Sequence, residues 1–342
     1  MSRDTIFIII FICFLLFLII LGLIGLKENK RELEKNERKK NNIVENNEFI
    51  LAKKEKYEKI MDDNTASLYG ERQLVKKRMI LYGILVFVAI ALYFIFKKPI
   101  LIPLIPITII VPGLIFGKQL NYIFRESSRM YNETTAAILK EYDNNLNYYP
   151  TDGFKREEYN SLYFTEPCDV YRSSDLIINL QNGFCYADVF IESIDHDDEG
   201  TTYNVEFDGS LARMNISNIG CTIILGGLGE NSFMRNDTFK IIKFENDNFN
   251  KMFVCFSDNE LSAYKILTPD VMEQFINIRN SSVGNIDIRI INDKLYIRFK
   301  GTNGFDGLEG SKNELFKSVA ILDHIIKTME NVKKIIESKN MN

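Results

Sequence analysis

Long runs of apolar residues without a charge occur only in the first third of the chain. Residues 6–26 and 79–96 contain no charged residue, and a third such run, residues 100–117, follows Lys97, Lys98 and Pro99. About 20 apolar helical residues cross the ~30 Å hydrocarbon core of a bilayer. The pattern therefore predicts three N-terminal transmembrane helices, followed by a water-soluble domain in which no comparable run occurs.

The first apolar run has two interpretations, a cleaved signal peptide or a retained signal anchor. A signal peptide has an apolar stretch of about 7–15 residues and a small-residue cleavage site. Residues 6–26 are longer than that, no A-x-A site follows, and a charged segment begins at Lys27. We therefore expect an uncleaved anchor.

The third apolar run contains Pro103, Pro106 and Pro112. Proline removes a backbone donor and kinks a helix, which membrane proteins tolerate when neighbours satisfy the freed groups. The prolines fit either a transport hinge or the kinked return leg of a helical hairpin. Because ion paths usually contain intramembrane ionisable residues and these spans contain none, the sequence favours the hairpin.

Lysine and arginine near the ends of the spans predict the orientation of the chain. The 27–78 segment and the start of the soluble domain carry 11 + 3 = 14 of them near span ends, whereas Arg3, Lys97 and Lys98 lie on the opposite side. Basic residues favour the cytoplasmic side. We expect an inner-membrane protein with residues 27–78 and 118–342 in the cytoplasm.

The 27–78 segment is rich in charges of both signs and is predicted to be helical. Glu34 and Arg38 form a favourable i,i+4 pair, and Ile43, Ile50 and Tyr57 recur every seven residues. Polar residues at the intervening heptad positions weaken a coiled-coil interpretation. A solvated helical segment is the simplest reading, and attraction of Lys35–Lys40 to anionic lipid headgroups is the alternative.

Apolar periodicity predicts a mixed α+β fold for the soluble part. A period near 3.5 continues the last span as an amphipathic helix to about residue 147, and Tyr149–Gly153 is typical of a turn. Strand patterns occur at 185–194, 202–207, 221–225, 239–244, 252–256, 264–267, 286–291 and 295–299. Helices and hairpins that alternate in this way indicate α+β.

Two helices are expected late in the chain. Thr268 is a good N-cap ahead of Pro269, and that helix carries Met272 and Phe275 on one face. The last helix opens with the capping box Ser311-x-x-Glu314. Its apolar stripe comprises Leu315, Val319, Leu322, Ile326, Met329 and Ile336.

The predicted organisation has five parts. They are a signal-anchor helix (1–26), a charged cytoplasmic helical segment (27–78), a transmembrane hairpin (79–117), an amphipathic connecting helix (118–150) and a cytoplasmic α+β domain (151–342).

Charge and cysteine content exclude some partners and sites. The net charge of −4 divides into 18 − 12 = +6 for residues 1–117 and 24 − 34 = −10 for residues 118–342. Nucleic-acid binding needs a basic surface, so the soluble part does not fit it. Cys168, Cys185, Cys221 and Cys255 lack paired spacing, which predicts reduced, inert thiols rather than a zinc site or a disulfide framework.

Three local patterns contain residue types found in metal, phosphate or catalytic sites, and each has a simpler structural explanation. The acidic run Asp195–Glu199 offers oxygen ligands but lacks EF-hand spacing and fits a polar hairpin tip. The run Gly226–Gly229 follows a strand but lacks the motif of a phosphate-binding loop. His324 lies beside the stripe of the last helix, as a partly buried structural histidine would. We therefore expect no catalytic, cofactor-binding or metal site from these patterns.

One stretch carries a resemblance to a known family. Residues 244–260, FENDNFNKMFVCFSDNE, with the following 263–272, AYKILTPDVM, resemble a family of bacterial membrane proteins of unknown function. The similarity extends over roughly residues 80–335. It implies a membrane hairpin followed by a cytoplasmic domain, and it implies no catalytic residues. Members share a gene setting with small membrane-anchored coiled-coil proteins, which implies a protein partner.

Taken together, the sequence favours a multi-pass membrane protein whose cytoplasmic domain is a non-enzymatic binding or scaffolding module. Its expected partners are the lipid bilayer and another membrane-associated protein, and a homo-oligomer is compatible with the pattern. A membrane-bound hydrolase with an active site built from scattered residues is the alternative. A transporter subunit built on the proline-rich span is a third.

The charge asymmetry generates a topology prediction. A reporter enzyme that works only outside the cytoplasm, fused after Asn342, should stay inactive, because basic residues hold the flanking segments inside. The same reporter fused before residue 1 should be active. Activity of the C-terminal fusion would reverse the orientation.

Overall fold

The computed structural model describes residues 38–63, 125–165, 168–197, 200–227, 239–282, 284–302 and 312–340. The three predicted spans, residues 6–26, 79–96 and 100–117, lie outside these ranges. Within the described residues, no helix combines the length and apolar character needed to cross a membrane.

The described strands form a nine-stranded sheet in the order β1-β2-β3-β4-β9-β8-β5-β7-β6, and all of its pairings are antiparallel. The strands are β1 (Leu146–Tyr149), β2 (Val170–Asn179), β3 (Phe184–Asp197), β4 (Gly200–Asn215), β5 (Thr222–Gly226), β6 (Lys240–Ile242), β7 (Val254–Ser257), β8 (Ile286–Ile291) and β9 (Lys294–Lys300). The helices are α2 (Glu48–Ala52), α5 (Arg156–Asn160), α6 (Asp247–Met252), α7 (Glu260–Ile266), α8 (Pro269–Ser281) and α9 (Lys312–Asn340). Residues 38–45, 54–63 and 125–142 are also helical. The mixed α+β class and the C-terminal helix are as predicted.

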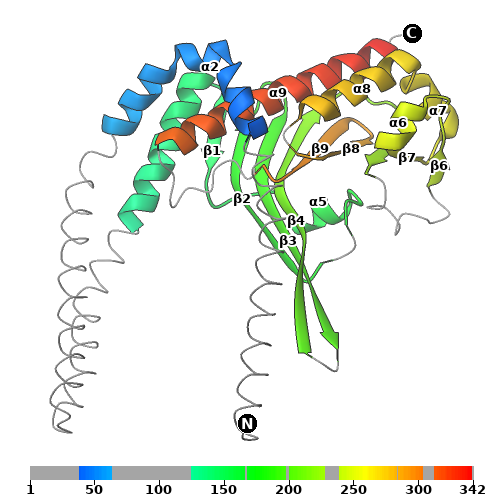
Figure 1. Ribbon diagram of the computed structural model, residues 1–342, viewed down its shortest axis with the longest axis horizontal. Helices are drawn as coiled ribbons and strands as arrows, with labels where there is room; N and C mark the ends of the chain where they lie inside the picture. The colour runs from blue at the N-terminus through cyan, green and yellow to red at the C-terminus, as the bar shows by residue number, and fades with distance from the viewer. Residues whose placement is uncertain are drawn as a thin grey trace, which may run out of the picture.

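A helical layer covers one face of the sheet. Helices α8 and α9 lie across it, together with residues 38–63 and 125–142 (Figure 1). Alternate strand residues, such as Ile288 and Ile297, bury against this layer together with Phe275 and Val319. The predicted stripe of α9 is the buried face of that helix, apart from the half-buried Ile326.

The opposite face of the sheet is covered by a short non-strand segment, residues 154–164, which contains α5. Phe154, Tyr159 and Phe164 of this segment pack on Val189 and Leu211 of the sheet. The central strands are therefore buried on both faces, although their sequences alternate between apolar and polar residues.

Charged side chains of β8 and β9 attach the 154–164 segment to the sheet. Arg289 donates to the carbonyls of Leu162 and Tyr163 at 3.0 and 3.1 Å, and its guanidinium lies 4.3 Å from the centre of the Phe164 ring. Arg298 lies 5.0 Å from the same ring and forms a buried ion pair with Asp287 at 2.6 Å. The segment lacks strand partners, so these donors satisfy carbonyls that burial would otherwise leave unpaired.

Burial opposes ionisation of Asp287, but the positive charges of Arg298 and Arg289 outweigh it and lower the pKa of this carboxyl below its usual value. Its other oxygen accepts from the backbone N–H of Gly227 at 3.1 Å. The carboxylate thus balances the charge of Arg298, is stabilised by the charge of Arg289, and holds the backbone at the end of β5.

Several predicted elements differ in the structure. The predicted strand at 264–267 is wrong, because these residues belong to helix α7 and the turn after it. The Asn259 side chain accepts from the Ser262 N–H and caps that helix, so that Ala263 and Ile266 bury one turn apart.

The connecting helix also ends earlier than predicted. It stops at residue 142, and Leu146–Tyr149 form β1, because Asp143 accepts from the Asn145 N–H and turns the chain. Leu146, which the helical pattern also places in the core, is buried as the first residue of β1.

The caps of the two late helices differ from the prediction or lie outside the structure. Thr268 stands at the N-cap of α8, with Pro269 at the first helical position, but its side chain makes no cap hydrogen bond and its hydroxyl donates to Asp270. The predicted N-cap position of Thr268 is therefore confirmed, but the predicted hydrogen bond from the helix to its side chain is not formed. Ser311 and the Glu314 side chain lie outside the described residues.

The buried ion pair generates a stability prediction. Asp287→Asn would remove the carboxylate from the buried ion pair with Arg298, so we expect the free energy of unfolding to fall by about 3–5 kcal/mol. Urea unfolding of the full chain in detergent, followed by circular dichroism, measures it. Asp152→Asn, at an exposed position, is the control and should change stability by less than about 0.5 kcal/mol. Equal stability of the two variants would show that the pair has little structural weight.

Candidate functional site

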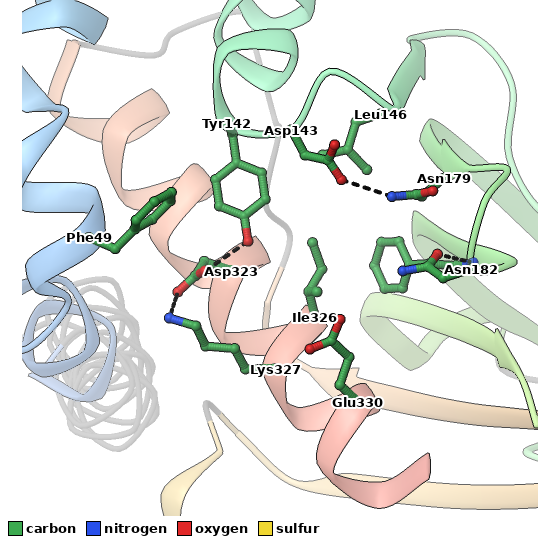
Figure 2. Close-up of a pocket in the computed structure, with 11 residues that line it drawn as sticks. Phe49, Tyr142, Asp143, Leu146, Asn179, Asn182, Asp323, Ile326, Lys327 and Glu330 are labelled. Carbon is green, nitrogen blue, oxygen red and sulfur yellow. Dashed lines mark hydrogen bonds and ion pairs between the residues drawn. The ribbon is translucent and has the colours of Figure 1, made fainter. Parts of the chain in front are cut away.

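A pocket of about 360 Å³ lies where four parts of the chain meet (Figure 2). The parts are α2, the region from the end of helix 125–142 to β1, the β2–β3 turn, and α9. The lining residues are Phe49, Tyr142, Asp143, Leu146, Asn179, Asn182, Phe184, Asp323, Ile326, Lys327 and Glu330.

Asp323 is the centre of the hydrogen bonding at this pocket. This residue is only 2% exposed, and its carboxylate accepts from the Tyr142 hydroxyl at 2.8 Å, the Asn47 side-chain amide at 2.6 Å and the Lys327 ammonium at 2.7 Å. Three donors from three segments satisfy the charge, which is how a carboxylate is tolerated in a buried position. Asp323 therefore joins residues 38–63, helix 125–142 and α9.

Apolar packing reinforces this joint. Ile50, Tyr57 and Met61 are fully or almost fully buried against the domain, and the Phe49 and Tyr142 rings meet edge to face at 5.8 Å. The heptad positions Ile50 and Tyr57 are thus buried, whereas we expected a solvated segment. The predicted helical structure is confirmed for residues 38–45, 48–52 and 54–63. Ile50 and Tyr57 of the seven-residue repeat belong to the same core as the buried residues of α9.

Burial also shapes the two tyrosines at the joint. It raises the pKa of Tyr57 and of Tyr142, and the negative charge of Asp323 contributes to both shifts. The Tyr57 hydroxyl has no hydrogen-bond partner among the described residues. Both tyrosines stay neutral at physiological pH, and their role here is packing and hydrogen-bond donation.

The remaining polar groups of the pocket are mostly bound to the protein. Asp143 accepts from the side-chain amide of Asn179 at 2.9 Å, and Asn182 accepts from the Phe184 N–H at 3.0 Å. Figure 2 shows these bonds on the side of the pocket opposite Asp323. The Asp143 and Asp323 carboxylates thus accept hydrogen bonds from side-chain amides of other segments. These bonds hold the segments together and occupy carboxylate oxygens that a catalytic role would need.

The predicted acidic cluster lies at the end of a long ribbon. Strands β3 and β4 pair as far as Asp197 with Gly200, so the described part of the run, Asp195 to Asp197, is the end of β3 next to the connection to β4. Asp195 accepts from the Asn204 side chain at 2.7 Å, and His196 bonds Thr201. Asp198 and Glu199 lie outside the described residues, and the described residues contain no group of three metal-binding side chains.

The glycine run Gly226–Gly229 and His324 were the other two patterns, and their described residues lie among groups that stabilise the fold. The Gly227 N–H donates to Asp287, so it is not free to bind a phosphate, and Leu228 and Gly229 lie outside the described residues. His324 is half-buried, burial lowers its pKa, and its Nε2 has no partner within the described ranges.

The four described cysteines, Cys168, Cys185, Cys221 and Cys255, are buried and free, as predicted. Burial raises the pKa of each thiol, to about 11 for Cys221. A raised pKa keeps the thiol protonated and therefore weakly nucleophilic.

The β3–β4 ribbon is a second candidate site that the sequence did not reveal. Beyond Phe207 it leaves the sheet and projects away from the helical layer (Figure 1). Tyr203 and Val205 are 63% and 56% exposed on it. Short apolar alternation at 202–207 is the signal for the strand, but only the tertiary structure shows that nothing described covers it.

Comparison with known proteins finds a family similarity in the C-terminal part of the chain. Residues 206–340, from β4 through α9, match the family described as "Protein of unknown function (DUF3137)". The matched stretch is therefore similar to the domain of that family. The match agrees with the predicted resemblance to a domain of unknown function, over a shorter stretch than residues 80–335. Strands β1 to β3 and helices 38–63 and 125–142 lie outside the matched range and share the sheet and the core with it.

No curated protein matches the chain. Among solved structures, the crystal structure of the mycobacterial trehalose monomycolate transport factor A, TtfA, matches with a TM-score of 0.33 and 9% identity. The match covers 59% of this chain and 95% of that chain. Similarity at this level is distant and supports no conclusion about the site.

The Asp323 joint generates a prediction of local undocking. Asp323→Asn removes the charge that three donors share and turns one acceptor oxygen into a donor facing Asn47 and Lys327. We expect faster amide hydrogen exchange across residues 48–61, with exchange in β8 unchanged. Glu330→Gln, which changes a pocket carboxylate outside the Asp323 hydrogen bonds, is the control. Unchanged exchange at residues 48–61 in Asp323→Asn would show that apolar packing alone docks the segment.

Proposed function

We propose that this chain is a multi-pass inner-membrane protein whose cytoplasmic DUF3137 domain is a non-enzymatic binding and scaffolding module. The apolar runs before residue 118 and the basic excess around them support the membrane location. The partner we expect is another membrane-associated protein.

The β3–β4 ribbon is the observation that carries this proposal. Large side chains such as Tyr203 and Val205 are costly to leave in water, and exposed apolar groups on a projecting element are typical of interaction sites. A two-stranded ribbon is marginally stable without support, so a partner that covers it also stabilises it.

The scaffolding part of the proposal rests on the Asp323 joint. Residues 38–63 lie in sequence between the predicted anchor and the predicted hairpin, and they are docked on α9 through Asn47 and Ile50. A domain held in this way would present its ribbon at a fixed place relative to the bilayer.

The hydrolase alternative would need carboxylates available for chemistry. The pocket carboxylates Asp323 and Asp143 instead accept hydrogen bonds from protein donors. That engagement supports a binding role. The transporter alternative depends on residues 100–117, outside the described residues.

In-cell photo-crosslinking tests the proposal. A benzophenone amino acid at position 203 should give a discrete crosslinked product of the full chain, because Tyr203 lies in the proposed contact. The same amino acid at position 180, where Leu180 is 78% exposed away from the ribbon, is the matched control. Products of equal yield and pattern from both positions, or none from position 203, would reject the ribbon as the binding site.

A further inference from the structure

Strand β4 has a bare edge in the projecting ribbon. Strand β9 pairs with β4 only between Gly209 and Asn215. On the side away from β3, no described strand pairs with residues 201–207. Exposed strand edges present unpaired N–H and C=O groups that recruit another strand.

The rest of the sheet shows how this protein protects its edges. Strand β6, at one end of the sheet, is three residues long and begins at the exposed Lys240. Strand β1, at the other end, is four residues long and is followed by Pro150. Short strands, lysine and proline are the usual means of blocking edge pairing.

The other edge of the ribbon itself is blocked. The Ile194 N–H on β3 donates to the Asp169 carboxylate at 2.7 Å, just beyond the last pairing of β2 with β3 at Glu192. The β4 edge, by contrast, consists of Thr201-Thr202-Tyr203-Asn204-Val205 up to the irregularity at Glu206, without lysine or proline. β-branched and aromatic residues of this kind favour strand pairing.

The side chains along this edge define what an added strand would contact. Tyr203 lies opposite Ile194, and Val205 lies opposite Glu192, so these four side chains share one face of the ribbon. A strand added beside β4 would place alternate side chains next to Tyr203 and Val205. Apolar residues at those positions would bury the two exposed groups.

The charge of the ribbon defines the rest of the partner. In the sequence from 192 to 206 there are six carboxylates and no lysine or arginine. The carboxylates are Glu192, Asp195, Asp197, Asp198, Glu199 and Glu206. A second copy of the same ribbon would bring like charges together, whereas a basic segment would be attracted.

We propose that the open β4 edge, residues 201–205, takes up an extended basic segment of another protein as an additional antiparallel or parallel strand. Main-chain hydrogen bonds supply affinity, alternate apolar side chains cover Tyr203 and Val205, and lysine or arginine meets the acidic tip. This inference rests on the proposed binding function and adds the chemistry of the partner.

Fluorescence anisotropy with synthetic peptides tests the inference on the full chain in detergent micelles. The probe is a labelled peptide that alternates lysine with valine. One comparison peptide replaces lysine by glutamate, and another keeps all side chains but is methylated at every backbone nitrogen. We expect only the unmethylated lysine peptide to bind, with the other two at least about tenfold weaker, because each lacks the charge or the backbone donors.

Variants of the chain locate the binding. Tyr203→Ser combined with Val205→Ser should weaken the lysine peptide about tenfold, a loss of about 1.4 kcal/mol. Leu180→Ser combined with Leu261→Ser removes apolar side chains that are more exposed than Tyr203 and Val205 but lie away from the ribbon, and it should leave binding unchanged. Both pairs change only exposed positions, and circular dichroism checks that each variant is folded.

Four results would overturn the inference. They are equal binding of the methylated peptide, equal binding of the glutamate peptide, equal weakening by the two variant pairs, and self-association of the chain that the ribbon variant abolishes. The last would identify a second copy as the occupant. A specific crosslink at position 203 together with failure of the lysine peptide would reject the basic strand and leave the proposed binding function standing.

Discussion

Burial of the central strands on both faces is the constraint on which the rest of the structure depends. The helical layer covers one face with apolar side chains, which needs no special chemistry. The other face is covered by residues 154–164, whose carbonyls have no strand partners. Arg289 and Arg298 supply the donors, and Asp287 forms a buried ion pair with Arg298. Without the three side chains, the second core under α5 would lose its cover.

The β3–β4 ribbon begins where the two layers that cover the sheet end. Up to Phe207, β3 and β4 are packed between the two layers, and Phe207 is itself buried. Beyond the irregularity between Ile191 and Glu192, the strands continue to Asp197 and Gly200, and Tyr203 and Val205 of β4 are exposed. Exposed Tyr203 and the bare β4 edge are therefore consequences of strand length, since shorter strands would have ended inside the core. The exposed β4 edge differs in this respect from the edges of the sheet at β1 and β6, which are formed by very short strands.

The sequence predicts those parts of the fold that local chemistry determines. The α9 stripe, the Pro269 start of α8 and the β8–β9 hairpin depend on periodicity and turn residues, and they are found where the pattern places them. The strand predicted at 264–267 failed because the Asn259 cap outweighed β propensity. The burial of Arg289 and Arg298 could not be predicted, because alternation in β8 and β9 is typical of strands with one face in water. The pocket was missed for a related reason: Asn47 and Asp323, which meet there, are 276 residues apart.

The two candidate sites play complementary parts because of their positions. The Asp323 joint lies in the helical layer, where it binds residues 38–63 to α9, and the ribbon projects away from that layer (Figure 1). Polar groups at the joint bond one another, whereas no described strand pairs with residues 201–205 of β4 on the side away from β3. A strand added at residues 201–205 would extend the same sheet that the joint anchors. The hydrogen-bonded sheet would then connect a bound partner to the docked segment without any conformational change, which is the physical requirement for a scaffold.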